Sequence, residues 1–151
     1  MSLDRTPPLH PDAVSLAAGV DPASLLDRVD AGPGCSVKDS FADVDLAPFG
    51  FRVLFEAAWQ RRPAPDPCPT TWSRLPDPYG SPDVAIVGDD DGRAVLNRSS
   101  DGVVGVTNQV GPQDGLAGAA AALFPGLPLV GYRLDGDGWE LLGPLRVWVR
   151  G

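Results

Sequence analysis

Three side chains in this sequence have the chemistry of acid–base catalysts, and each also has a plainer interpretation. Tyr132 could act as a general acid, and Glu56 or Glu140 as a general base. An aromatic residue in an apolar strand usually packs with its hydroxyl at the rim, and isolated glutamates on strands are usually solvated. The sequence therefore assigns no catalytic residue.

Metal chemistry is not expected either. Residues 89–92 and 135–138 cluster carboxylates, which are ligands of Ca²⁺, but both segments have the length and the glycines of a hairpin turn. Cys35 and Cys68 lack the spacing of a zinc site and are interpreted as reduced, structurally incidental thiols. His10 is the single histidine, so a Ser-His-Asp triad is set aside unless His10 lies in a folded arm.

The composition argues against two classes of partner, nucleic acids and membranes. The chain has 151 residues, enough for one hydrophobic core, and a formal net charge of −8 with Lys38 as its single lysine. Nucleic-acid binding depends on clustered basic residues, so no nucleic-acid partner is expected. No stretch approaches the ~20 apolar residues that span a bilayer, so we expect no membrane partner and a cytoplasmic location. The abundance of Ala, Gly, Pro, Asp and Arg is typical of a GC-rich bacterial genome.

Proline and glycine set the element boundaries in the first half of the chain. The 18 Gly and 17 Pro favour strands and loops, with few and short helices. Helix N-cap residues, prolines and runs of β-forming residues then indicate where each helix, strand and loop lies. The expected elements are a flexible N-terminal arm at 1–20, a helix from Asp21 to about Asp30, a loop at 35–50, a strand at 51–59, and a proline-rich connection at 61–82 that includes a brief strand at 71–75.

The second half alternates apolar segments with turn residues, which predicts an antiparallel meander. An alanine-rich stretch ended by Pro125-Gly126 predicts a helix, and the strands on either side of it should be parallel neighbours. The expected elements are strands at 83–87, 93–97 and 103–110, a helix at 116–124, a strand at 127–133, and closing strands at 139–142 and 145–149 around Gly143-Pro144. Together they predict one α+β domain over residues 1–151, with a mixed, largely antiparallel twisted sheet and few helices.

This order of elements resembles that of the GNAT superfamily of N-acetyltransferases, in which a meander leads into a strand-loop-helix-strand unit and a terminal hairpin. The resemblance extends from residue 21 to the C-terminus, with gaps. It is carried by the strings GPGCSVKDSF at 32–41, VVGVTN at 103–108, FPGLPLVGY at 124–132 and LGPLRVW at 142–148.

The resemblance implies acetyl-CoA as cofactor and the place where it binds. In such proteins the central strand parts from its neighbour, the pantetheine arm pairs with the strand backbone, and the pyrophosphate binds amides at the start of the following helix. The residues so assigned are Val104, Val106 and Asn108 for the arm, and Gly111, Gln113, Gly115 and Gly118 for the phosphates. The implied function is transfer of an acetyl group to an unidentified small amine.

Departures from the family pattern leave a second function open. Pro112 and Leu116 stand where the phosphate motif needs glycine, and Asp114 adds a carboxylate there. Residues 76–82 are too few for the two helices that shape the acceptor site in the family. The alternative is a non-catalytic GNAT-fold module for binding or dimerisation, and an unrelated α+β protein is a third possibility. The four tryptophans and an uncovered sheet face suggest a homodimer.

Overall fold

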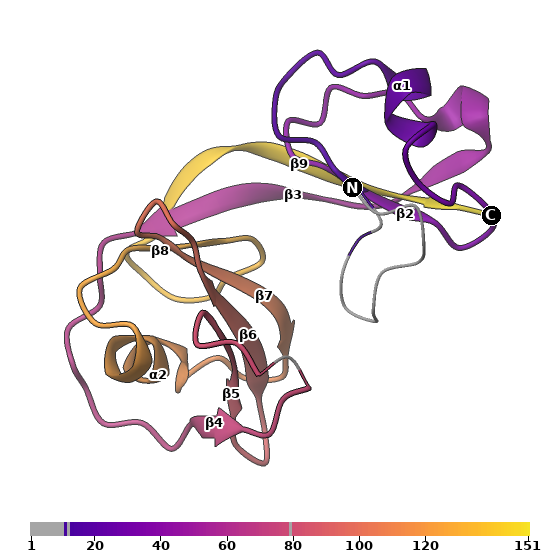
Figure 1. Ribbon diagram of the computed structural model, residues 1–151. Coiled ribbons are helices and arrows are strands. Elements are labelled where there is room, and N and C mark those ends of the chain that lie inside the picture. The colour runs from indigo at the N-terminus through magenta and orange to yellow at the C-terminus, as the bar shows by residue number, and fades with distance from the viewer. Residues whose placement is uncertain (1–10, 12, 79) are drawn as a thin grey trace. The chain divides into compact units, whose positions relative to one another are not determined.

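The computed structural model describes residue 11, residues 13–78 and residues 80–151, whose elements are drawn in Figure 1. The chain divides into two compact units, a terminal unit of residues 1–58 with 143–151 and a central unit of residues 59–142. Strands β3 (Phe51–Arg62) and β9 (Glu140–Arg150) contribute residues to both units. The single domain expected over residues 1–151 stays a prediction.

The terminal unit is a small sheet with one short α-helix. Its elements are β1 (Ala13–Val14), α1 (Pro22–Leu26), β2 (Ser36–Asp39), the 3-10 helix η1 (Ala47–Phe49), and its own parts of β3 and β9. β1 pairs in parallel with β2, and β2 pairs antiparallel with β9. The apolar core of this unit contains Ala13, Leu25, Val29, Cys35, Val37, Val44, Leu46, Phe51 and Trp148.

Helix α1 begins as the sequence predicts but is shorter. The Asp21 carboxylate accepts a hydrogen bond from the Ser24 amide at 3.0 Å, and Pro22 occupies the first turn. The helix ends at Leu26 rather than near Asp30. Beyond it, the amides of residues 28 and 29 bond to carbonyls three residues back, which is the pattern of a tight turn.

Two segments that were expected to be irregular belong to this sheet. Ala13 lies in the predicted flexible arm, yet it is 2% exposed and pairs with Val37. The part of that prediction that concerns residues 1–10 and 12 lies outside the described residues. Residues 36–39 were predicted as part of a loop but form β2, because Val37 pairs with Trp148 at the far end of the sequence. A strand of four residues with so distant a partner carries little local signal.

The central unit contains the rest of the sheet and one helix. Its elements are the end of β3, then β4 (Ser73–Leu75), β5 (Val84–Gly88), β6 (Arg93–Arg98), β7 (Val104–Val110), α2 (Leu116–Leu123), β8 (Leu129–Gly131) and the start of β9. The hydrogen-bonded order is β3-β8-β7-β6-β5-β4. β7 and β8 are parallel, and the other neighbours in this run are antiparallel.

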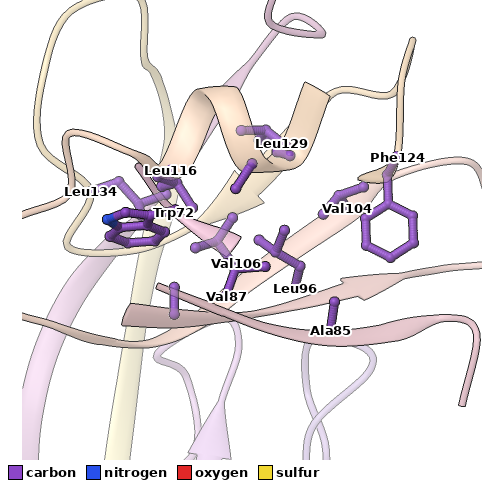
Figure 2. Close-up of a cluster of buried hydrophobic side chains, with 13 residues drawn as sticks. Trp72, Ala85, Val87, Leu96, Val104, Val106, Leu116, Phe124, Leu129 and Leu134 are labelled. Atoms are coloured by element: carbon purple, nitrogen blue, oxygen red, sulfur yellow. The ribbon is translucent and has the colours of Figure 1, made fainter. Parts of the chain in front are cut away.

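Figure 2 shows the core of the central unit, in which α2 lies against side chains that rise from β5, β6 and β7. Leu96, Val104 and Val106 are fully buried there. Phe124 stands near Val104 at one end of the cluster, and Trp72 stands near Leu116 at the other. Each such aliphatic side chain contributes roughly 1.5–3 kcal/mol by its burial, so this core fixes α2 over the strands.

The predicted meander, the helix after it and the parallel pairing across that helix are all confirmed. The sheet is mixed and the helices are few, as expected. The predicted closing hairpin is wrong, because Gly143 and Pro144 lie inside the continuous strand β9. Gly143 does not adopt a left-handed conformation, and both proline and the residue before it are compatible with an extended chain.

Candidate functional site

Strands β7 and β8 part within the central unit. They pair over three positions, namely Val104 with Leu129, Gly105 with Val130, and Val106 with Gly131. β8 then ends, while β7 continues to Val110 in contact with β6. Strand pairing between β7 and β8 therefore stops at Val106, and we call the region beyond it, formed by residues 107–110 and 132–135, the β7–β8 gap.

A bulge in β7 lies at the same point. Two steps along β6, from Arg93 to Val95, match three steps along β7, from Val110 to Thr107, so β7 carries one extra residue. Within this stretch Asn108 has a φ of 55°, a left-handed conformation that asparagine adopts more readily than most residues. A bulge bends and twists its strand. β7 is therefore bent where its pairing with β8 ends.

Glutamine side chains bridge the β7–β8 gap. Nε2 of Gln109 donates a hydrogen bond to the carbonyl oxygen of Tyr132. Nε2 of Gln113 donates to the carbonyl oxygen of Arg133 at 3.0 Å, and its Oε1 accepts from the Asp135 amide at 2.9 Å. By strand alternation, the Tyr132 carbonyl is a group that a longer β8 would have paired with β7, and Gln109 satisfies it.

A third glutamine holds the same segment from another strand. Gln60, on β3, donates from Nε2 to the carbonyl oxygen of Leu134 at 2.9 Å and accepts from the Leu134 amide at 2.8 Å. The carbonyls of three consecutive residues, 132–134, each receive a glutamine amide. The chain after β8 is thus fixed by side chains without a helix of its own.

Tyr132 lies half-buried beside the gap. Its ring meets the ring of Trp59 edge to face, with centroids 5.6 Å apart and an interplanar angle of 82°. Burial raises the pKa of the Tyr132 phenol, and the charge of Arg133 lowers it by a smaller amount. The shift keeps the phenol protonated to a higher pH than in an ordinary tyrosine. Packing against Trp59 accounts for its position, as the sequence predicts for an aromatic residue near an apolar strand.

The predicted arm-binding residues lie on β7. Val104 and Val106 bury their side chains completely in the core, and their backbones pair with Leu129 and Gly131 of β8. The Val104 amide donates to the carbonyl oxygen of Pro128 at 2.9 Å and so faces β8, and strand alternation places Val106 on the same edge. Asn108 lies at the bulge, next to the gap. These residues stand in line along the edge of β7 that leads into the gap.

The proline-rich connection covers two of the predicted phosphate-binding glycines. A Cβ on Gly115 would stand 2.1 Å from Cδ1 of Trp72, and a Cβ on Gly118 would stand 2.7 Å from Cβ of Thr70 and 3.1 Å from the carbonyl oxygen of Cys68. Oγ1 of Thr70 also donates to the carbonyl oxygen of Gly115 at 2.9 Å. At both positions, glycine makes room for the protein's own atoms.

The third glycine of that loop meets an acidic turn. A Cβ on Gly111 would stand 2.1 Å from the carbonyl oxygen of Asp91, and a Cβ on Gly92 would stand 2.0 Å from that of Pro112. The turn of residues 89–92 and the loop after β7 are thus in backbone contact. The carboxylates of residues 89–91 give this turn a negative charge, which would repel a phosphate bound by the adjoining loop.

Asp89 shapes the acidic turn. Its Oδ2 accepts from Oγ1 of Thr71 at 2.7 Å, and its Oδ1 accepts from the amides of Asp91 and Gly92. These bonds, that from Thr71 first, lower the pKa of Asp89. The described residues contain no group of three or more His, Cys, Asp or Glu side chains that could hold a metal ion. Within that part of the chain, residues 89–92 form the hairpin turn between β5 and β6.

The two glutamates considered as bases are exposed. Glu56, in the terminal unit, pairs with Arg146 through Oε1 and Nε at 2.8 Å. Glu140 begins β9 in the central unit. Both side chains are exposed to solvent, which is what the sequence analysis expects of isolated glutamates on strands.

Gln60, Gln109 and Trp72 are features of this site that the sequence interpretation missed. Glutamine in a strand usually indicates a solvated position, and only the three-dimensional path of residues 132–135 shows what these amides bond. Trp72 lies in the predicted brief strand at 71–75, and its contact with Gly115 is visible only in the structure. The one signal in the sequence was the pair of closely spaced glycines, Gly115 and Gly118, which leave room for neighbouring atoms such as those of Trp72.

Comparison with known proteins places the fold. No family model matches the sequence, and no curated protein matches it. A GCN5-related N-acetyltransferase from Kribbella flavida matches the structure with a TM-score of 0.55 and 16% identity, over 91% of this chain and 80% of that one. A GNAT-family acetyltransferase from Novosphingobium aromaticivorans matches with a TM-score of 0.51 and 12% identity, over 80% of this chain and 76% of that one. The chain therefore has a GNAT-like fold, which confirms the resemblance.

No helix in the described part of the chain is long and apolar enough to cross a membrane. Of its two free thiols, Cys35 is buried in the terminal unit and Cys68 is exposed near the start of α2.

Proposed function

We propose that this protein binds the pantetheine arm of acetyl-CoA in the β7–β8 gap and transfers the acetyl group to a small amine. The observation that carries the proposal is the end of β7–β8 pairing at Val106 and Gly131, beside the bulge at Asn108, in a GNAT-like fold. An extended arm that contains amides can pair with a strand edge whose neighbour has left it. Acetyl-CoA would supply the acyl thioester.

The two ends of acetyl-CoA fit this chain unequally. The stretch of β7 beyond Val106, where pairing with β8 has ended, suits the arm, whereas protein atoms occupy the space that the glycines of the 111–118 loop create. The acidic turn at 89–92 adds repulsion toward a phosphate. We therefore assign recognition to the arm, with little contribution from the nucleotide.

Tyr132 is the residue whose role in turnover can be tested first. A thiolate leaving group needs a proton, and the Tyr132 phenol carries one at neutral pH, as an ordinary tyrosine does. In a functional enzyme, Tyr132→Phe would lower kcat and leave the affinity for acetyl-CoA unchanged. An unchanged kcat would show that Tyr132 serves packing alone.

The proposal is tested by calorimetry with acetyl-CoA and with S-acetyl-pantetheine, which lacks the nucleotide. We expect both to bind, with dissociation constants that differ by less than about tenfold, because the nucleotide contributes little to recognition. A factor of ten corresponds to about 1.4 kcal/mol of binding free energy. Turnover would then be measured with a panel of small amines by chromatography of the released thiol. Absence of binding by both ligands at millimolar concentration would refute the proposal.

A second function is favoured by the filled glycine positions of the 111–118 loop. In this alternative the GNAT-like sheet serves binding or dimerisation and has no catalytic role. It predicts a homodimer in sedimentation and no turnover with any amine in the panel. A monomer that acetylates an amine would exclude it.

We retain a bacterial cytoplasm as the proposed location.

A further inference from the structure

We propose that the side chain of Gln109 occupies the place of the ligand's arm and must be displaced before the arm can enter the β7–β8 gap. This inference rests on the proposed function, since it concerns how that same site admits its ligand. It makes Gln109 the residue that sets affinity and selects the ligand class.

The register of β7 and β8 shows why Gln109 is in an unusual position. Continuing the parallel pairing past Val106 and Gly131 would bring Tyr132 opposite Thr107. The Tyr132 carbonyl instead receives the side-chain amide of Gln109, which lies beyond the bulge. A primary amide on a side chain therefore supplies the N–H that a neighbouring strand would supply.

The group that Gln109 replaces is chemically specific. The Tyr132 carbonyl is the first one past the end of β8, so it is an acceptor at the entrance to the gap. A pantetheine arm carries secondary amides, whose N–H groups are donors of the same kind as Gln109 Nε2. A thioester without an amide cannot replace this bond, and its entry would leave the carbonyl without its donor.

Release of Gln109 need not release the segment that it contacts. Gln60 holds Leu134 through two hydrogen bonds, and Gln113 holds Arg133 and Asp135. These four bonds remain when the Gln109 side chain turns away. The gap can therefore open at the Tyr132 carbonyl while residues 133–135 stay in place.

The test compares Gln109→Ala and Gln109→Met with the matched control Gln60→Met. Methionine keeps the length of glutamine but cannot donate, and Gln60 bonds the same segment from β3. We expect both Gln109 variants to bind acetyl-CoA about three- to tenfold more tightly than wild type, because the ligand no longer competes with an internal hydrogen bond. Gln60→Met should bind no more tightly than wild type. S-Methyl thioacetate, which has no amide, should bind none of them.

A second measurement does not use the ligand. Amide hydrogen exchange around Tyr132 should quicken in both Gln109 variants, while the far-ultraviolet circular dichroism stays that of wild type. Equal or weaker binding of acetyl-CoA by both Gln109 variants would overturn this inference and leave the proposed function standing. Absence of binding by wild type and by both variants would overturn the proposed function and this inference with it.

Discussion

The indole of Trp72 lies directly on Gly115 at the start of α2, so that a Cβ on Gly115 would stand 2.1 Å from Cδ1 of the ring. Oγ1 of Thr70 bonds the Gly115 carbonyl and also accepts from the Trp72 amide at 3.0 Å, which fixes the indole in place. The proline-rich connection is thereby attached to the helix that follows β7. This relationship gives Gly115 a role in packing.

Gly115→Ala should therefore destabilise the protein. Gly115 has a φ of −87°, which alanine adopts without strain, so the effect isolates the clash with Trp72. Overpacking of this kind costs about 1–3 kcal/mol, and urea unfolding followed by tryptophan fluorescence measures it. Gly105→Ala is the matched control, because its Cβ would have only ordinary contacts, with the nearest atom 3.7 Å away. Equal urea midpoints for the two variants would contradict this account.

Asp39→Ala tests the terminal unit. Asp39 is fully buried, and its Oδ2 accepts from the Val44 amide at 2.9 Å while its Oδ1 accepts from the Phe41 amide at 3.3 Å. Removing the carboxylate leaves a buried amide without its acceptor, at a cost of about 1–3 kcal/mol. Hydrogen exchange at Val44 should quicken accordingly. In Asp45→Ala, an exposed counterpart that caps Ala47, water can replace the lost acceptor and the cost should stay below about 1 kcal/mol.

The phenol of Tyr132 gives a prediction for alkaline pH. Burial holds the pKa of Tyr132 above 10.0, so the unfolded chain loses this proton before the folded one does. The stability that Tyr132 contributes is fully present below pH 10 and falls as the pH rises through its raised folded-state pKa. Absorbance titration should show one of the chain's two tyrosines ionising above the ordinary range. Loss of the late phase in Tyr132→Phe would assign it, and its persistence there would contradict the assignment.

Much of the central unit could be predicted because its signals are local. Asp-Gly turns separate β5, β6 and β7, and an alanine-rich helix between two apolar segments predicts that β7 and β8 are parallel. The strand β2 could not be predicted, because Val37 depends on Trp148 for its pairing. The uninterrupted course of β9 through Gly143-Pro144 was missed because that dipeptide is also typical of a turn.

The candidate site was harder to predict than the fold. The spacing of Gly111, Gly115 and Gly118 indicates close approach of some atoms, but a sequence does not say whether they belong to a ligand or to the protein. Here they belong to residues 68–72 and to the turn at 89–92. Gln109 bonds Tyr132 from a position beyond the bulge in β7, and no pattern of residues in the sequence predicts that bulge.

Entry of an acyl-thioester arm into the β7–β8 gap can be observed residue by residue. Its most direct test is an NMR titration of the isotopically labelled chain with acetyl-CoA, followed through the backbone amides. We expect shifts concentrated at residues 106–109 and 131–134, with smaller changes at 111–118, where protein atoms fill the space beside the glycines. Unshifted amides at 106–109 and 131–134, or shifts confined to the terminal unit, would contradict it.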